Sequence, residues 1–331
     1  MVRQWICCTS TLVLVFSDPL RVVALTDPPD RAGIVVAVGD PTCAGAKFWL
    51  QRATFTLVEH PCADPRTVQV PDVGEALAQI GERVATWPQT AAVCDDVLRA
   101  FDPAAPAFAG LITESLAYST LQSGREFARW LVDRGPKAVS LLPDPVVSHR
   151  DGDILHVAFN RPQRHNAFST DARAALLEAV EVARFDTSVV GLVLTGNGRS
   201  FCSGGDLAEF GTFEDPTSAH LARTSYSPAL VLDEIATRLG AACQAMVHGQ
   251  VLGSGLEMAA FCGQVTCDPS ATLGLPELAL GLIPGAGGTV SITRRIGRWR
   301  TAYLVLSGVT IDAETAQSWG LVDVVAAWPS G

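Results

Sequence analysis

Residues 246–289 read MVHGQVLGSGLEMAAFCGQVTCDPSATLGLPELALGLIPGAGGT, and the rest of the chain is best understood from this stretch. Between Arg238 and Arg294 the chain carries only three formal charges, at Glu257, Asp268 and Glu277. Glu257 lies in a short segment that is apolar on every side, which is typical of a buried helix. Glu277 follows a proline, stands between two leucines, and has no basic residue nearby in the sequence. The stretch therefore places two carboxylates in apolar surroundings.

Two carboxylates in apolar surroundings are unusual enough to indicate a catalytic role. Burial of an unpaired carboxylate is costly, or it raises the pKa until the group holds a proton near neutral pH, which suits a general acid. Either glutamate alone could be a hydrogen-bonded core residue or a helix N-terminal charge. Both, however, accompany runs of small residues, Gly253-Ser254-Gly255 and Gly285-Ala286-Gly287-Gly288, that let backbone approach a ligand closely. The pair therefore favours a catalytic site.

The same stretch resembles the signature of the crotonase (enoyl-CoA hydratase/isomerase) superfamily. Three further segments agree with that family in order and spacing: NRPQRHNAF from Asn160, TGNGRSFCSGGDLAEF from Thr195 and GLVDVV from Gly320. The resemblance covers about residues 146–325. It implies an α/β fold, a crotonase-like ββα spiral, preceded here by a small α/β N-terminal domain.

The resemblance also implies an activity, the hydration of a 2-enoyl-CoA thioester to a 3-hydroxyacyl-CoA by a lyase. Glu257 would orient and deprotonate the water, and Glu277 would deliver a proton to Cα. The backbone N–H groups of Gly205 and Ser254 would form an oxyanion hole, in which losing one donor typically raises the barrier by roughly 2.7 to 4 kcal/mol. Ser254 departs from the family, where glycine is common. Because the donor is backbone, we expect function to survive.

Coenzyme A is expected as part of the substrate, with no permanently bound cofactor and no metal. The resemblance implies that it is bound by Arg164, His165, Asn166, Ala167, Ser203, Asp206, Leu207, Gly253, Pro276 and Gly285. The guanidinium group of Arg164 could bind a phosphate, although the same sequence is equally consistent with a solvated arginine in a loop. The arginines at 294, 295, 298 and 300 are more typical of a solvated helix face or a subunit contact.

Two other functions remain open from the sequence. The first is a crotonase-type isomerase or lyase that uses one glutamate, although retention of both acids favours hydration. The second is a non-catalytic acyl-CoA binding or assembly subunit. After Asp323 the chain stops within eight residues, whereas the family continues through C-terminal helices that cover the acyl pocket. We hypothesise that the N-terminal region, or a neighbouring subunit, serves as the lid.

Composition narrows the class of partners. A net charge of -10 without a basic run argues against nucleic acid or an anionic membrane as the main partner. Nine irregularly spaced cysteines do not form a disulfide framework, which favours a reducing, cytoplasmic compartment. The apolar run 5–16 is shorter than the ~20 residues of a membrane span and favours a strand. By analogy with the family, we expect a homotrimer or a dimer of trimers.

The domain organisation follows from breaks in the apolar pattern. We predict an N-terminal α/β domain over residues 1–135, a linker over 136–145 and the catalytic domain over 146–331. The N-terminal domain is predicted to hold strands at 11–16, 21–25, 34–38 and 54–58, then helices at 73–87, 90–101, 108–121 and 125–133. The catalytic domain is predicted to hold strands at 154–159, 189–195, 243–247 and 265–267, a helix at 170–184 and one long helix at 216–239.

Overall fold

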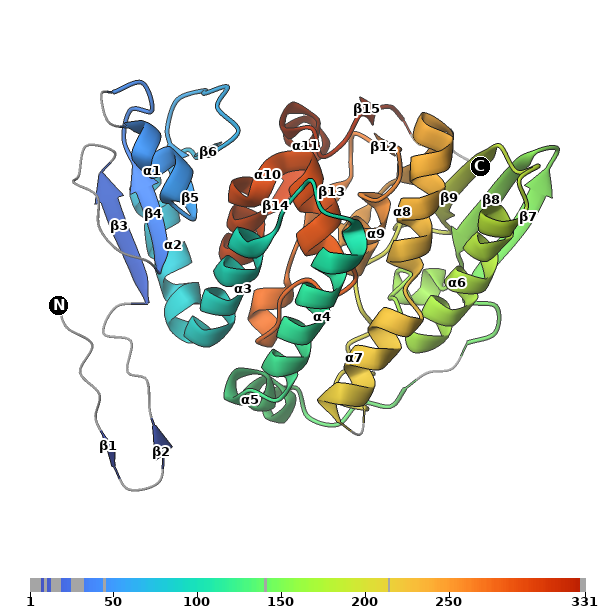
Figure 1. Ribbon diagram of the computed structural model, residues 1–331, viewed down its shortest axis with the longest axis horizontal. Helices are drawn as coiled ribbons and strands as arrows, with labels where there is room; N and C mark the ends of the chain where they lie inside the picture. The colour runs from blue at the N-terminus through green and yellow to red at the C-terminus, as the bar shows by residue number, and fades with distance from the viewer. Residues whose placement is uncertain are drawn as a thin grey trace.

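The computed structural model describes residues 7–8, 11–12, 19–24, 33–43, 46–139, 142–213 and 215–327. The described part has a small parallel sheet at one end, a larger sheet at the other, and helices between them (Figure 1). This arrangement confirms the predicted α/β class.

The N-terminal sheet contains four parallel strands in the order β3-β4-β5-β6. They are β3 (Leu20–Ala24), β4 (Ile34–Val38), β5 (Phe55–Val58) and β6 (Thr67–Gln69), with α1 (Ala46–Arg52) between β4 and β5. β4 and β5 are buried almost throughout, as expected for parallel strands covered on both faces. The strands predicted at 21–25, 34–38 and 54–58 are confirmed.

The strand predicted at 11–16 lies mostly outside the described residues. Its first two residues form β2 (Thr11–Leu12), which pairs antiparallel with β1 (Cys7–Cys8). The sequence analysis did not identify β6 or α1, both of which are short.

Four helices follow the N-terminal sheet, and all four were predicted. They are α2 (Val73–Thr86), α3 (Pro88–Ala100), α4 (Ala107–Gln122) and α5 (Arg125–Arg134). The carboxylate of Asp72 caps α2 by accepting the Glu75 N–H, and Pro88 begins α3 at a position where a helix tolerates proline. α4 packs against α7 and α10 as well as α3, so it lies in the middle layer of the molecule (Figure 1).

The second half of the chain builds a six-stranded sheet in the order β15-β12-β10-β9-β8-β7. Only the β7–β8 hairpin is antiparallel, with Val146 opposite Phe159. The strands are β7 (Val146–Asp151), β8 (Ile154–Phe159), β9 (Gly191–Gly196), β10 (Cys243–Val247), β12 (Gln264–Cys267) and β15 (Val324–Val325). A three-stranded sheet of β11 (Gln250–Leu252), β13 (Thr272–Gly274) and β14 (Thr310–Asp312) accompanies it.

Helices and short 3-10 turns connect these strands. The helices are α6 (Thr170–Phe185), α9 (Ser254–Ala259), α10 (Gly288–Ser307) and α11 (Ala313–Trp319), and the turns are η1 (Pro162–Arg164), η2 (Gly240–Ala242) and η3 (Glu277–Leu280). The Ser169 hydroxyl caps α6 by accepting the Ala172 N–H, as its sequence predicts. α10 is interrupted at Gly297, whose φ of 76° is non-helical.

The single helix predicted over 216–239 is wrong. The structure has two helices, α7 (Pro216–Ser225) and α8 (Pro228–Leu239), with Tyr226 and Ser227 between them. Pro228 disfavours helical backbone at the residue before it, and the Ser227 hydroxyl starts α8 by accepting the Leu230 N–H. Because of this break, α7 does not continue the axis of α8, and α7 packs against α4.

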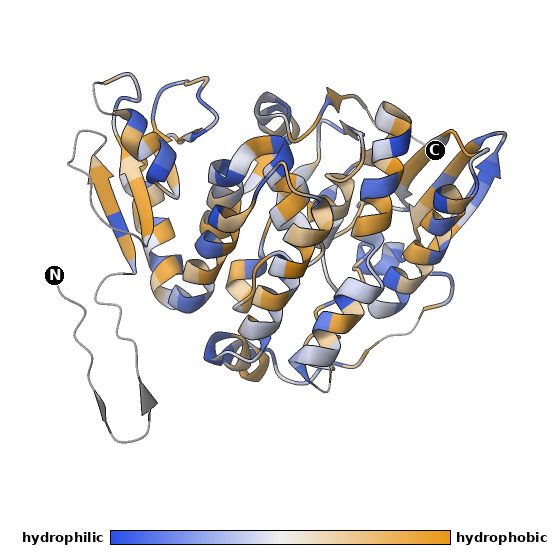
Figure 2. Cartoon of the chain, viewed as in Figure 1, coloured by the Kyte–Doolittle hydropathy of each residue, from blue (hydrophilic) through white to orange (hydrophobic). Residues whose placement is uncertain are grey.

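One apolar core joins the two parts of the chain. This core includes buried residues from Ile34 in β4 to Val322 beyond α11, and Figure 2 shows hydrophobic residues on the N-terminal strands and on the middle helices. Arg298 donates to the carbonyl oxygens of Ala53, at 3.1 Å, and Gln51, while Arg300 donates to that of Thr67 at 3.4 Å.

Arg298 and Arg300 are therefore not part of the solvated face that the sequence suggested, whereas Arg294 is exposed. Arg300 is only 8% exposed and its guanidinium lies over the Trp319 ring. Arg298 binds the end of α1 and Arg300 binds β6, whereas Arg294 pairs with Asp233 on α8. Within the described ranges, no helix combines the length and apolarity that a membrane crossing requires.

Candidate active site

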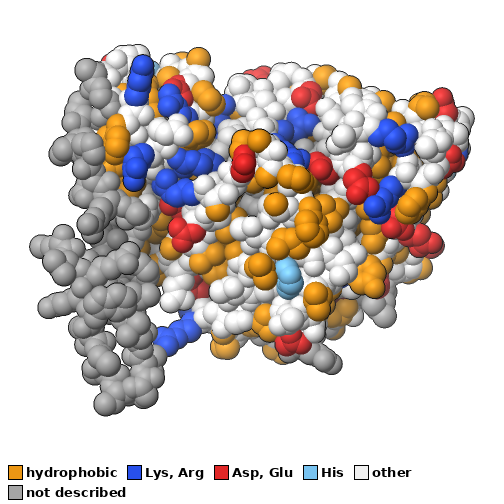
Figure 3. Space-filling model, in the orientation of Figure 1, with side chains coloured by type: hydrophobic (Ala, Val, Ile, Leu, Met, Phe, Trp, Pro, Cys, Tyr) orange, Lys and Arg blue, Asp and Glu red, His pale blue; other side chains and the backbone are white. Residues whose placement is uncertain are grey.

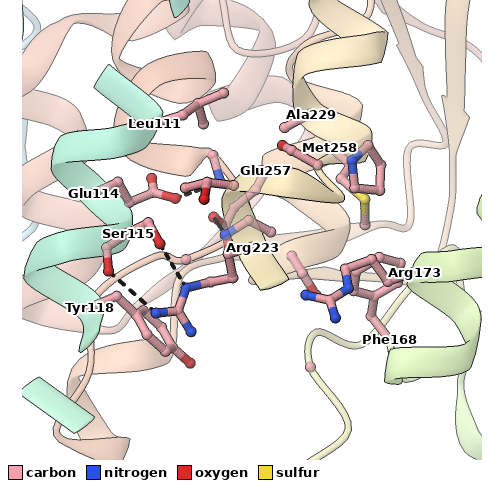
Figure 4. Close-up of a pocket in the computed structure, with 18 of the residues that line it drawn as sticks. Leu111, Glu114, Ser115, Tyr118, Phe168, Arg173, Arg223, Ala229, Glu257 and Met258 are labelled. Atoms are coloured by element: carbon pink, nitrogen blue, oxygen red, sulfur yellow. Dashed lines mark hydrogen bonds between the residues drawn. The ribbon is translucent and has the colours of Figure 1, made fainter. Parts of the chain in front are cut away.

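A cavity between α4 and the catalytic half brings together the four residues to which the sequence analysis gave chemical roles. Glu257, Glu277, Gly205 and Ser254 all line it. Its other walls come from α4, α6, α7 and the start of α8, and Figure 4 shows α4 side chains facing Glu257 across the space. On the outside, Figure 3 shows hydrophobic side chains gathered near the middle of the face that α4 helps to form.

Glu257 lies in the first turn of the short helix α9. Its side chain is 1% exposed, and its Oε2 accepts hydrogen bonds from the backbone N–H groups of Ala286, at 2.7 Å, and Gly288, at 2.8 Å. A Cβ at Gly288 would lie 2.6 Å from Cγ of Glu257, so this position needs glycine. The glycine-rich run therefore serves to hold one oxygen of Glu257 by two amides.

Glu114 of α4 holds the same run from the other side. It is 2% exposed and accepts the N–H groups of Gly287, at 2.7 Å, and Thr289, at 2.9 Å, together with the Thr289 hydroxyl at 2.7 Å. Glu257 and Glu114 thus bind alternate amides of residues 286–289. We call this arrangement the amide clamp.

Sequence analysis missed Glu114, although a usable signal was present. It lies in GLITESLAYSTLQ, an apolar helical segment with no basic residue, which is the same pattern that singled out Glu257. Nothing in the sequence indicated that α4 would reach residues 286–289, from which Glu114 is separated by more than 170 positions.

Glu277 lies at the start of η3 and is 9% exposed. Its Oε2 has no hydrogen-bond partner among the described residues, and its Oε1 faces Gly253, where a Cβ would come within 2.4 Å. Gly253 also has a φ of 48°, so both the space and the backbone favour glycine there. Glu277 therefore keeps a carboxylate oxygen unengaged at the cavity wall.

Burial shifts the pKa of all three glutamates upward. It raises the pKa of Glu277 to about 8 and that of Glu114 to about 7, in the second case against hydrogen bonds from Thr289 and Gly287 that lower it. The pKa of Glu257 is raised well above its ordinary value, first by burial and then by the charges of Glu114 and Glu277. The charge of one of these carboxyl groups thus raises the pKa of another, so their titrations are linked.

The backbone N–H groups of Gly205 and Ser254 both lack a hydrogen-bond acceptor within the described part of the chain. Ser254 is the first residue of α9, where a helix leaves its amides unpaired. Two backbone hydrogen bonds join the segments that carry these amides. The Cys202 N–H donates to the Gln250 oxygen at 3.1 Å, and the Leu252 N–H donates to the Cys202 oxygen at 2.9 Å. Two unused donors therefore stand at one cavity.

The two loops predicted to hold coenzyme A lie side by side. The Ser203 N–H donates to the His165 oxygen at 3.0 Å, and Asp206 forms an ion pair with Arg164 at 3.0 Å. Asp206 also pairs with the buried Arg161 at 2.9 Å, a partner that the sequence analysis did not identify. The Asn166 side chain is occupied by backbone groups of the neighbouring loops.

The cavity wall includes only two of the residues predicted to bind coenzyme A, Asp206 and Gly285. The remaining eight lie outside the wall: Arg164, His165, Asn166, Ala167, Ser203, Leu207, Gly253 and Pro276. In the described ranges, no three His, Cys, Asp or Glu side chains are grouped so that they could hold a metal ion.

Comparison with known proteins identifies the family. A model of the family described as enoyl-CoA hydratase/isomerase matches residues 149–328. The chain belongs to the enoyl-CoA hydratase/isomerase family. The matched region includes both glutamates of the pair and both unpaired amides, whereas Glu114 lies outside it.

Curated relatives carry hydratase names. The chain is 36% identical to the 2,3-dehydroadipyl-CoA hydratase of Escherichia coli, over 54% of this chain and 68% of that protein. It is 34% identical to a mevalonyl-coenzyme A hydratase of Aspergillus fumigatus, over 54% of this chain and 65% of that protein. The chain thus spans about two thirds of the length of these relatives.

A solved structure of the family agrees with the fold. It is an enoyl-CoA hydratase/isomerase family protein from Mycobacterium abscessus, with a TM-score of 0.50 and 28% sequence identity. The match covers 56% of this chain and 72% of that one. The N-terminal sheet and its helices are additional to the part of this chain that the family model matches.

Proposed function

We propose that this protein adds water across the double bond of a 2-enoyl-CoA to give a 3-hydroxyacyl-CoA. The observation that carries the proposal is the meeting of two buried glutamates, Glu257 and Glu277, with two unpaired amides at one cavity. The hydratase names of the curated relatives support the same reaction class.

The reaction can be written with these groups. The thioester oxygen accepts the N–H groups of Gly205 and Ser254, which stabilise the negative charge that develops on it. Glu257, with one oxygen held by the amide clamp, takes a proton from water as the water oxygen bonds to Cβ. Glu277 delivers its proton to Cα, and its raised pKa keeps that proton in place near neutral pH. The two acids then return to their starting states by exchanging one proton.

We further propose that α4 closes the acyl pocket. This is supported by the α4 side chains of Leu111, Ser115 and Tyr118 in the cavity wall and by the Glu114 contacts of the amide clamp. Exclusion of water matters because it strengthens each electrostatic contact inside the site. The trimeric or hexameric assembly expected from the family stays a prediction, which light scattering of the purified protein would check.

A panel of acyl-CoA substrates with mass-spectrometric detection tests the reaction. We expect a 2-enoyl-CoA such as crotonyl-CoA to gain the mass of one water. A 3-enoyl-CoA that is converted to its conjugated isomer without gaining water would instead support isomerisation. Tight binding of the thioesters without turnover of any of them would overturn catalysis and favour the binding-subunit alternative.

A further inference from the structure

Two arginines line the cavity besides the acids. Arg173 comes from α6 and Arg223 from α7, both are half-buried, and Figure 4 shows both guanidinium groups at the space beside Glu257. Sequence analysis gave neither of them a role, because an arginine on an amphipathic helix normally points to solvent.

Arg223 is held by neutral partners. Its guanidinium donates to the Ser115 hydroxyl at 3.1 Å, to the Gln122 side-chain oxygen at 3.1 Å and to the Ser119 hydroxyl, and it lies 4.5 Å from the centre of the Tyr118 ring. No carboxylate in the described ranges forms an ion pair with it. The contacts therefore orient the cation without neutralising it.

Arg173 has still fewer partners. Its guanidinium forms no hydrogen bond and no ion pair with the described residues, although it is half-buried. Burial lowers the pKa of both arginines, and the nearby charges of Glu209 and Glu114 partly offset this effect on Arg173 and Arg223 respectively. The charge of Arg173 also lowers the pKa of Arg223, so the two cations repel each other. Two guanidinium groups close to each other raise the free energy of the folded protein, and an anion bound between them would lower it.

The carboxylates of the cavity do not supply that anion. Asp206 already pairs with Arg161 and Arg164, and Glu209 accepts the N–H and hydroxyl of Thr170, at 2.6 and 2.9 Å, at the start of α6. Glu114 and Glu257 are occupied by the amide clamp. Glu209 and Glu114 are thus near enough to influence the two cations, but no carboxylate in the described ranges forms an ion pair with either guanidinium.

We infer that Arg173 and Arg223 bind a carboxylate at the far end of the acyl chain, so that the substrate is a 2-enoyl-CoA whose acyl group ends in a second acid. The inference rests on the proposed hydration and specifies its substrate class. The cavity wall also includes the apolar side chains of Leu111, Met258 and Phe213, which suit a short methylene segment. Planar guanidinium groups match a carboxylate with paired hydrogen bonds.

Two substrates of equal chain length test the inference. They are 2,3-dehydroadipyl-CoA, the compound in the name of one relative, and 2-hexenoyl-CoA, which has a methyl group where the other has a carboxylate. We expect the wild-type kcat/KM ratio to favour the diacid by roughly 10- to 150-fold, the range for one charge-assisted hydrogen-bonded pair. Arg173→Gln should bring this ratio toward one. Arg184→Gln, on the outer surface of the same helix, is the matched control and should leave the ratio unchanged.

The alternative source of the anion is a phosphate of coenzyme A. In that case Arg173→Gln would lower kcat/KM by the same factor for both substrates and leave the ratio intact, which would overturn the inference. A wild-type ratio near one would overturn it as well. Circular dichroism of each variant, compared with Arg184→Gln, checks that the fold is retained.

Binding measurements separate this inference from the proposed reaction. Calorimetry with the saturated thioesters, adipyl-CoA and hexanoyl-CoA, needs no turnover. Tighter binding of adipyl-CoA to the wild type, lost in Arg173→Gln, would support the carboxylate site even if no hydration were detected. Equal Kd values would overturn the carboxylate site while leaving hydration untouched.

Discussion

At the scale of single residues, the unengaged oxygen of Glu277 is the most informative feature. A buried carboxyl group without a partner is costly in the native state, and proteins keep such groups where they transfer protons. Glu257 differs, because two amides hold one of its oxygens. The two acids therefore have different surroundings despite their similar burial, which fits two different tasks.

Glu277→Gln should lower kcat for hydration by roughly 10²- to 10⁴-fold, the usual contribution of a general acid. The amide keeps the shape of the side chain but has no proton to give. The measurement is the rate of 3-hydroxyacyl-CoA formation, with the Kd of a saturated acyl-CoA as the control for an intact pocket. A variant with near wild-type turnover would remove Glu277 from the mechanism.

The raised pKa of Glu277 also predicts how stability depends on pH. Folding moves that pKa from 4.5 to about 8, so the folded protein holds the proton more tightly than the unfolded chain does. The resulting stability is fully present below pH 4.5 and is lost as the pH rises through about 8. The free energy of unfolding should therefore fall less steeply with pH in Glu277→Gln. Urea titrations across this window would check it, and equal slopes in both proteins would contradict it.

At the scale of elements, α4 contributes to the site as much as any helix of the catalytic half. Its Glu114 completes the amide clamp, and Tyr118 packs so closely on Gly285 that a Cβ there would lie 2.4 Å from the ring. The glycine-rich run is therefore shaped by two neighbours, Glu257 and α4. The family resemblance covers residues 146–325, so it could indicate the role of Glu257 but not that of α4.

Glu114→Gln should lower both stability and kcat. The amide group would point a donor at backbone N–H groups, at a cost of roughly 1 to 3 kcal/mol, and would loosen the segment that fixes Glu257. Glu126→Gln is a matched control, because Glu126 is also buried and accepts two amides and a hydroxyl, those of Gln89 and Thr90, away from the cavity. We expect similar losses of stability in urea for the two variants but a fall in kcat only for the first. Equal kcat values would reduce Glu114 to a structural residue.

The sequence predicted elements better than their contacts. The strands at 34–38 and 154–159 agree to the residue, because continuous or alternating β-branched runs leave little ambiguity. The prediction of one long helix at 216–239 failed because the apolar spacing continues across Pro228, whereas the helical backbone is interrupted there. The roles of Arg173 and Arg223 could not be assigned, since their surroundings depend on helices that are distant in sequence. The apolar segment around Glu114 could have marked it as a candidate, but it did not indicate which residues Glu114 would contact.

At the scale of the whole molecule, the two parts of the chain share one core and one site. α3 and α4 pack against α10 and α7, and Arg298 donates to the carbonyl oxygen of Ala53, which follows α1. The predicted division into residues 1–135, 136–145 and 146–331 thus stays a proposal about chain segments. It does not imply that either segment is stable alone.

Cleavage in the connecting segment tests this view. Lys137 is exposed and lies outside any helix or strand, so trypsin should cut after it early. We expect the two fragments to elute together from a sizing column and to keep hydratase activity, because their shared contacts do not depend on that peptide bond. Lys137→Gln, which removes the cut, serves as the control. Fragments that separate without denaturant would show that the N-terminal part is an independent domain.

The amide clamp also bears on how the protein is made. Glu114 leaves the ribosome 173 residues before Gly287. At the usual elongation rate of roughly 5–20 residues per second, α4 therefore waits roughly 9 to 35 s for its binding partner. During that interval the apolar side chains of a nascent helix stand open to other unfinished chains, so assistance from a chaperone would act at this stage of synthesis.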